Sequence, residues 1–233
     1  MNQQTLLQTP PLSLYIHIPW CVRKCPYCDF NSHEPGNELD ESAYITALMS
    51  DLDQELVDNK HREIKSIFFG GGTPSLFSAE SINNIIEGVR SKASLTKDIE
   101  ITLEANPGTF EQQKFSEFRS AGVNRLSIGV QSFNDDKLHR LGRIHNGKEA
   151  IMAIESAYAA GFENINLDLM FGLPAQSVAE AIEDVELACK LQPSHVSHYQ
   201  LTIESNTYFH KHTPALPATD FIWDMQQHCH DTL

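Results

Sequence analysis

Short apolar segments alternate with longer amphipathic segments along most of this chain. Residues 12–18 alternate apolar and polar side chains and are rich in β-formers, so they predict a strand that Pro19 ends. Residues 41–59 carry apolar side chains at helical spacing, and these are Tyr44, Ile45, Leu48, Leu52 and Leu56. The start of the chain therefore predicts a strand followed by a helix.

The same alternation then repeats. Further strands are predicted at residues 64–69, 98–105, 125–130, 164–170 and 195–201. Helices are predicted at about residues 78–90, at 109–121 and 147–160, at about 177–191, and at 219–233. Ser78 is the expected N-cap of its helix, and Gly161 is expected to end another. Strand–helix units at roughly 30-residue spacing predict an α/β fold of parallel strands, either TIM-like or doubly wound.

Polar residues near the ends of the predicted strands favour the barrel. They are Tyr15, His17, Glu104, Gln131 and Asp168, and the second strand runs into a glycine-rich turn at residues 70–74. In a βα barrel every strand ends on one rim, which holds the active site. Each residue also has a structural explanation, such as a strand-end carboxylate, a buried salt bridge or a tight turn. Together they predict a partial TIM-type (βα)6 barrel at residues 12–205, after a leader at 1–11 and before a further region at 206–233.

Composition and charge narrow the class of protein. The 233 residues are 41% hydrophobic and 21% charged, as in ordinary globular proteins. No apolar run approaches the roughly 18–20 residues that span a bilayer, and the N-terminus does not resemble a signal peptide. The net charge of −14 argues against a nucleic-acid partner. We therefore expect a cytoplasmic protein, in which clustered cysteines are metal ligands rather than disulfides.

Three of the five cysteines, Cys21, Cys25 and Cys28, lie within eight residues. Three thiolates can hold a [4Fe–4S] cluster and leave one iron open for a small chelating molecule. Zinc is the alternative, because His17 or His33 could supply a fourth ligand. We expect the two distant cysteines, Cys189 and Cys229, to be a buried and an exposed thiol rather than ligands.

The spacing Cys-x3-Cys-x2-Cys, with Tyr27 before the last cysteine, resembles the radical SAM superfamily. The segments at residues 15–21, 70–74, 104–107, 129–133 and 168–174 look like its HemN/HemW branch, which contains oxygen-independent coproporphyrinogen III oxidase and the heme chaperone HemW. The resemblance implies a radical SAM core with S-adenosylmethionine (SAM) on the open iron of a [4Fe–4S] cluster. In that family the reduced cluster splits SAM into methionine and a 5′-deoxyadenosyl radical.

The same resemblance implies roles for individual residues. Cys21, Cys25 and Cys28 would hold the cluster. The cluster-bound SAM would be contacted by Tyr15, Gly71 and Glu104, with Tyr27 near its adenine. Five further residues match positions that hold a second SAM in the oxidase, and these are Gly72, Thr73, Gln131, Arg143 and Asp168.

Departures from the oxidase pattern favour the chaperone group of the branch. The oxidase has a fourth cysteine two residues after the third, where this chain has Phe30 in Cys28-Asp29-Phe30. Arg143 in Leu141-Gly142-Arg143-Ile144-His145 also resembles the chaperone group. We therefore expect heme binding and transfer to an acceptor protein, with a membrane protein left open as that acceptor. The alternative is coproporphyrinogen III oxidase activity, and SAM cleavage is left open. The His-Asn-x-x-Tyr-Trp motif proposed for heme does not occur in the chain.

Overall fold

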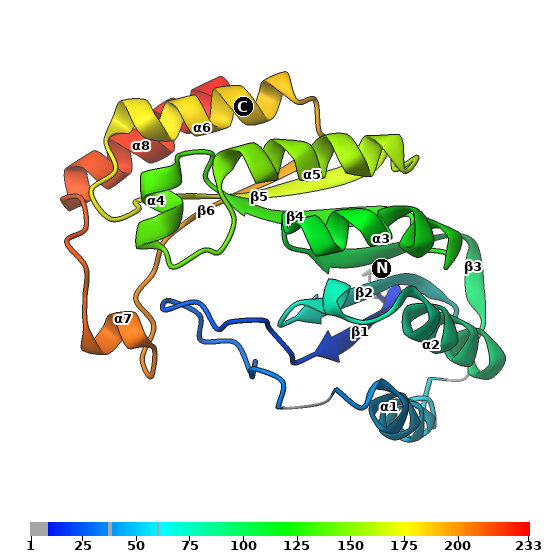
Figure 1. Ribbon diagram of the computed structural model, residues 1–233. Coiled ribbons are helices and arrows are strands. Elements are labelled where there is room, and N and C mark those ends of the chain that lie inside the picture. Colours follow the sequence, from blue (N-terminus) through cyan, green and yellow to red (C-terminus); the bar gives the residue numbers. More distant parts are fainter. Residues whose placement is uncertain (1–8, 37–38, 60) are drawn as a thin grey trace, which may run out of the picture.

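Six parallel strands form one curved sheet in the computed structural model, which describes residues 9–36, 39–59 and 61–233. The strands are β1 (Leu12–Ile18), β2 (Ile64–Gly71), β3 (Leu95–Ala105), β4 (Arg125–Gln131), β5 (Asn164–Phe171) and β6 (His195–Gln200), in that order across the sheet (Figure 1). A doubly wound sheet would reverse its strand order at a switch point. The unbroken order confirms the predicted barrel class, and among the described residues β1 and β6 remain the two edges of an open barrel.

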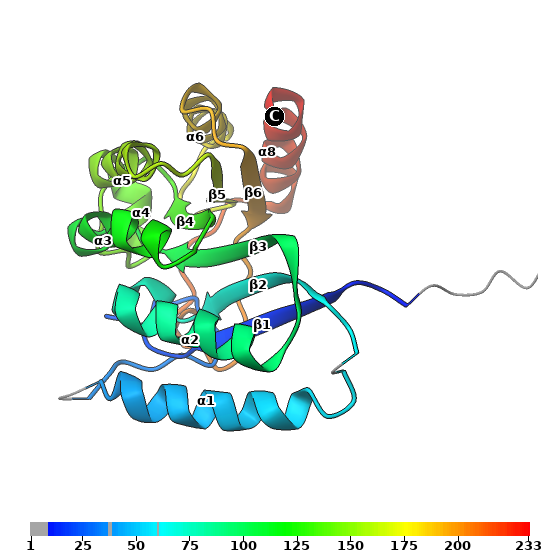
Figure 2. The same cartoon turned by 90° about the vertical axis from the view of Figure 1, so that its right-hand side faces the viewer.

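The long helices lie on the outside of the curved sheet (Figure 2). They are α1 (Glu41–Glu55), α2 (Ala79–Lys92), α3 (Thr109–Ser120), α5 (Gly147–Ala159) and α6 (Val178–Lys190), with α8 (Thr219–Thr232) packed beside α6. Ser78 caps α2 as predicted, because its side chain accepts a hydrogen bond from the backbone N–H of Ser81. None of the described helices is both long and apolar enough to cross a membrane.

Three short helical segments were not predicted. They are the 3-10 turn η1 (Pro74–Leu76) and the helices α4 (Asp135–Arg140) and α7 (Tyr208–Lys211). Segments this short show no helical period in the sequence. The predicted helix at residues 41–59 ends early, at Glu55, and the predicted strand at 98–105 begins earlier, at Leu95, where Ile64 pairs with it. Residues 1–8 of the predicted leader lie outside the described residues, and the boundary at residue 206 stays a prediction.

Two apolar clusters hold this framework together. The larger one lies between the sheet and the outer helices, and includes Phe69 of β2, Leu103 of β3 and Phe118 of α3. A smaller cluster on the other side of β5 contains Leu141, Met170, Leu173, Leu201 and Phe209, with Tyr27 packed against it. The backbone N–H of Phe209 donates to the carbonyl of Pro26 at 2.9 Å. The small cluster therefore fixes α7 against the cysteine-containing loop.

Candidate metal and cofactor site

One cavity of about 300 Å³ contains all three clustered cysteines. Its walls come from the loop after β1, from the carboxyl ends of β2 to β6, and from the turn after α4. Ten of the twelve residues predicted for the site line it: Cys21, Cys25, Cys28, Gly71, Gly72, Thr73, Glu104, Gln131, Arg143 and Asp168. The carboxyl ends of parallel strands in a barrel meet on one rim, and this brings the distant residues together.

The other two predicted residues, Tyr15 and Tyr27, do not line the cavity. Tyr15 is 56% exposed, stacks on Phe68, and shares a 3.0 Å hydrogen bond with Nδ1 of His17. Tyr27 belongs to the cysteine loop, and its side chain packs against the small apolar cluster, with its ring 6.3 Å from that of Phe209. Burial raises the pKa of the Tyr27 phenol, so it stays protonated. In this structure both tyrosines support the walls rather than form them.

Backbone hydrogen bonds close the loop that carries the cysteines. The N–H of Cys21 donates to the carbonyl of His33 at 2.9 Å, and the N–H of His33 donates to Pro19 at 2.7 Å. A tight turn then follows, in which the N–H of Cys28 donates to the carbonyl of Cys25 at 3.1 Å. All three thiols are free and half-buried. The loop therefore presents three separate sulfurs to one space.

The arrangement of these thiols fits an iron–sulfur cluster better than a zinc ion. In the described part of the chain, no three His, Cys, Asp or Glu side chains converge to hold a single metal ion. Both ring nitrogens of His17 are engaged, with Tyr15 and with the carbonyl of Asn31, and His33 contacts the Asn31 side chain. Three thiolates of a [4Fe–4S] cluster bind three different irons, so they need not converge on one point. The donor set therefore fits such a cluster.

Glycines at the end of β2 bring that strand against the cysteine loop. Gly71 has a φ of +116°, and a Cβ there would lie 2.6 Å from the His17 ring. A Cβ on Gly72 would lie 2.5 Å from the backbone oxygen of Trp20. The N–H of Thr73 also donates to that oxygen, at 2.7 Å. Gly72 is thus required by close approach of two backbones and Gly71 by the His17 ring and its own positive φ, in addition to any room that they leave for a ligand.

An acidic group of side chains forms one wall of the cavity. Oε2 of Glu104 accepts a 3.1 Å hydrogen bond from the N–H of Gly71. The carboxylate of Asp168 accepts hydrogen bonds from Ser127 at 3.1 Å and from Asn166 at 2.8 Å. Burial, with the nearby charge of Asp168, raises the pKa of Glu104 to about 7, and burial also raises the pKa of Asp168. This wall can accept hydrogen bonds from an ammonium group or from hydroxyls.

Gln131 and Tyr199 form a second polar wall. Gln131 is buried, and its φ of 67° lies in the left-handed region that few residues other than glycine adopt. Its Oε1 accepts a 2.7 Å hydrogen bond from the Tyr199 hydroxyl. Part of the Tyr199 ring is exposed, but burial of its hydroxyl raises its pKa. A strained backbone at a cavity wall is typical of binding sites.

Several residues that line the cavity were not predicted. Asn106 donates from Nδ2 to Thr73 Oγ1 at 3.0 Å, and its Oδ1 accepts from Arg143. Asn106 belongs to the segment at residues 104–107, so the family resemblance contained a signal for it. Tyr199 lies near the end of the sixth predicted strand, where the polar strand-end pattern could have indicated it. Ser127, in the middle of an apolar strand, gave no such signal.

The raised pKa of Glu104 predicts a pH-dependent stability. Between its ordinary pKa of 4.5 and its folded value of about 7, the folded carboxyl keeps a proton that the unfolded one has lost. Folding stability from this group is therefore lost as pH rises through that range, by about 3 kcal/mol in all. Urea unfolding of the iron-free protein at several pH values measures this loss. As pH rises through the range, the free energy of unfolding of Glu104→Gln should increase by this amount relative to that of the wild type. Glu100→Gln, exposed on the same strand, should track the wild type, and parallel curves for all three proteins would contradict the burial of Glu104.

Comparisons with known proteins show the family and the fold of this chain. A family model described as the radical SAM superfamily matches residues 15–188. Proteins named heme chaperone HemW from Escherichia coli and Haemophilus influenzae are 52% and 53% identical over 98% and 96% of this chain. The chain spans 60% of the length of each. The solved structure of E. coli coproporphyrinogen III oxidase (HemN), described as a radical SAM enzyme, is 26% identical with a TM-score of 0.83, over 93% of this chain and 51% of that one.

Proposed function

The chain belongs to the radical SAM superfamily, and from this premise we propose that it binds heme and passes it to an acceptor protein. Family membership implies a [4Fe–4S] cluster and SAM. The relatives named heme chaperone HemW support the heme function, because they match nearly all of this chain at about half identity. We place the protein in the cytoplasm, where free thiols persist. The acceptor protein is unknown.

The cavity carries the cofactor part of the proposal. Cys21, Cys25 and Cys28 would hold three irons of the cluster, and the fourth iron would be open to SAM. Radical SAM proteins use such a cluster to supply one electron to the SAM sulfonium. The single observation behind this assignment is that three free thiols share one cavity with the acidic wall.

The polar walls would orient SAM within the cavity. Glu104 and Asp168 would accept hydrogen bonds from the methionyl ammonium or the ribose hydroxyls. Gly72, Thr73 and Gln131 line the same space, which supports the second-SAM positions implied by the resemblance. Their side chains and backbone would orient the ligand. Tyr15 and Tyr27 would support the walls indirectly, through the contact of Tyr15 with His17 and of Tyr27 with Phe209.

The second candidate is coproporphyrinogen III oxidase, favoured by the TM-score of 0.83 to the enzyme of that name. Against it stands Phe30, which lines the cavity at 59% exposure where the oxidase pattern has a fourth cysteine. A phenyl ring cannot ligate iron or relay a proton as a thiol does. The chaperone therefore remains the preferred function.

A heme titration of reconstituted protein tests the proposal. Hemin added in steps should give a saturable change in the heme absorbance band, both for this chain and for the longer E. coli relative titrated in parallel. If only the longer protein bound heme, the heme site would lie outside residues 1–233 and this chain would not be a heme carrier.

The oxidase alternative needs its own assay. Reduced protein incubated anaerobically with SAM and coproporphyrinogen III should leave the substrate unchanged, with the E. coli oxidase run beside it as a positive control. Clear formation of protoporphyrinogen IX by this chain would overturn the preference for the chaperone.

A further inference from the structure

The guanidinium of Arg143 lies against the cysteine loop. Its Nη1 donates to Sγ of Cys25 at 3.4 Å, and its Nη2 donates to the carbonyl of Gly129 at 3.0 Å and to Oδ1 of Asn106. The Nε is buried and has no partner among the described residues. The Arg143 guanidinium therefore donates three hydrogen bonds, and one of them goes to a cysteine that is assigned to the cluster.

The turn that carries Arg143 is interlocked with the cysteine loop. The N–H of Arg143 donates to the carbonyl of Leu138 at 2.9 Å, which ends α4 in a tight turn. Gly142 in this turn has a φ of +74°, and a Cβ there would lie 2.6 Å from the Pro26 ring. Arg23, in the cysteine loop, donates back to the carbonyl of Gly142. A shift of this turn would therefore move Arg143 and the cysteine loop together.

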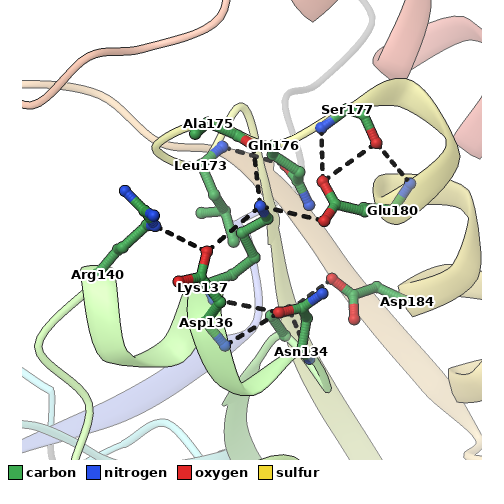
Figure 3. A network of polar contacts seen from close by, with 11 residues as sticks. Asn134, Asp136, Lys137, Arg140, Leu173, Ala175, Gln176, Ser177, Glu180 and Asp184 are labelled. Atoms are coloured by element: carbon green, nitrogen blue, oxygen red, sulfur yellow. Dashed lines mark hydrogen bonds and ion pairs between the residues drawn. The ribbon is translucent and has the colours of Figure 1, made fainter.

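A buried lysine in the middle of α4 anchors this helix to the barrel (Figure 3). The side chain of Lys137 is almost fully buried, and its Nζ lies 3.1 Å from Oε1 of Glu180. The same Nζ donates to the carbonyl of Ala175 at 2.8 Å. Ala175 lies in the connection between β5 and α6, and Glu180 lies in the first turn of α6, so Lys137 ties α4 to the start of α6. The framework of the barrel thus determines where Arg143 lies.

We propose that Arg143 is a positioning residue that tunes the cluster, because its guanidinium donates a hydrogen bond to the Cys25 sulfur and so raises the cluster's reduction potential. The inference rests on the proposed function, which assigns a cluster to Cys21, Cys25 and Cys28. Reduction adds one electron to the cluster, and a nearby positive charge with an N–H to sulfur stabilises the reduced form more than the oxidised form. This task differs from the second-SAM contact that the family resemblance implies.

An anaerobic redox titration followed by electron paramagnetic resonance (EPR) tests the inference. Arg143→Gln removes the positive charge and the paired N–H donors of the guanidinium. It should lower the midpoint potential of the cluster by about 59 mV, so that the ratio of reduced to oxidised cluster at a fixed potential falls about tenfold. Arg143→Lys keeps the positive charge but not the planar guanidinium, and its midpoint potential should lie between those of Arg143→Gln and the wild type. It also serves as the deciding variant if Arg143→Gln does not load a cluster.

Arg140 supplies the matched control. It is an arginine of α4 whose guanidinium pairs with Asp136 at 2.7 Å, at the surface. Arg140→Gln also removes one arginine charge, three residues before Arg143, and should leave the midpoint potential unchanged. Equal midpoints for the wild type and both Arg143 variants, with full iron content, would overturn the inference alone. Failure of the wild type itself to load iron on its cysteines would instead overturn the proposed function, and the tuning role with it.

Discussion

Replacing Cys21, Cys25 and Cys28 together by alanine is expected to abolish cluster loading. After anaerobic reconstitution the wild type should carry about four irons and four sulfides per chain with the broad visible absorbance of an iron–sulfur protein, and the triple variant should carry almost none. The reason is that the three thiols are free and line the same cavity. Iron and sulfide analysis with an absorbance spectrum measures the effect directly.

Cys189 is the matched control for this experiment. It is exposed, belongs to α6 and does not line the cavity. Cys189→Ala should therefore load as much iron and sulfide as the wild type. A triple variant that kept the full metal complement, or a Cys189→Ala variant that lost it, would place the metal site elsewhere and contradict the account.

Replacing Lys137 by methionine is expected to lower the free energy of unfolding by about 3 kcal/mol, the low end for breaking a buried ion pair. Methionine has a similar length but leaves the carbonyl of Ala175 and one oxygen of Glu180 without their cation. The low end applies because the Glu180 side chain is 30% exposed and still accepts a hydrogen bond from the N–H of Ser177 at 2.8 Å. Urea unfolding followed by circular dichroism gives the value.

Lys190→Met is the control for the stability measurement. Lys190 pairs with Glu186 on the surface of α6, with 71% of its side chain exposed. Exposed pairs of this kind contribute less than about 1 kcal/mol, so the change should be small. If Lys137→Met proved as mild as Lys190→Met, the polar network of Figure 3 would not anchor α4.

The sequence was sufficient to predict the barrel because the apolar patterns indicate the alternating strands and long helices, and polar residues near the strand ends favour a barrel over a doubly wound sheet. It could not predict α4 or α7, because four to six residues do not complete two helical turns. This omission matters for the site, because the turn after α4 carries Arg143, and Phe209 of α7 packs against Tyr27. Both segments are held by tertiary contacts that no local pattern encodes.

The candidate site was predictable where polar residues end apolar strands. Glu104, Gln131 and Asp168 stand out in this way, and barrel geometry brings them to one cavity. The contacts of these residues were less predictable. Tyr199 also lies near a strand end, but its hydrogen bond to Gln131 joins residues distant in sequence, and Ser127, which donates to Asp168, lies in the middle of an apolar strand that gives no signal. The left-handed backbone of Gln131 also leaves no trace in the sequence.

The EPR spectrum of the reduced cluster, recorded with and without SAM, tests the central claim most directly. Three cysteines in one cavity leave one iron open, so SAM should change the spectrum. SAM labelled with ¹⁵N or ¹⁷O in its methionyl group should also show hyperfine coupling to the cluster. A fully loaded, reduced cluster whose spectrum is unchanged by saturating SAM would contradict the claim.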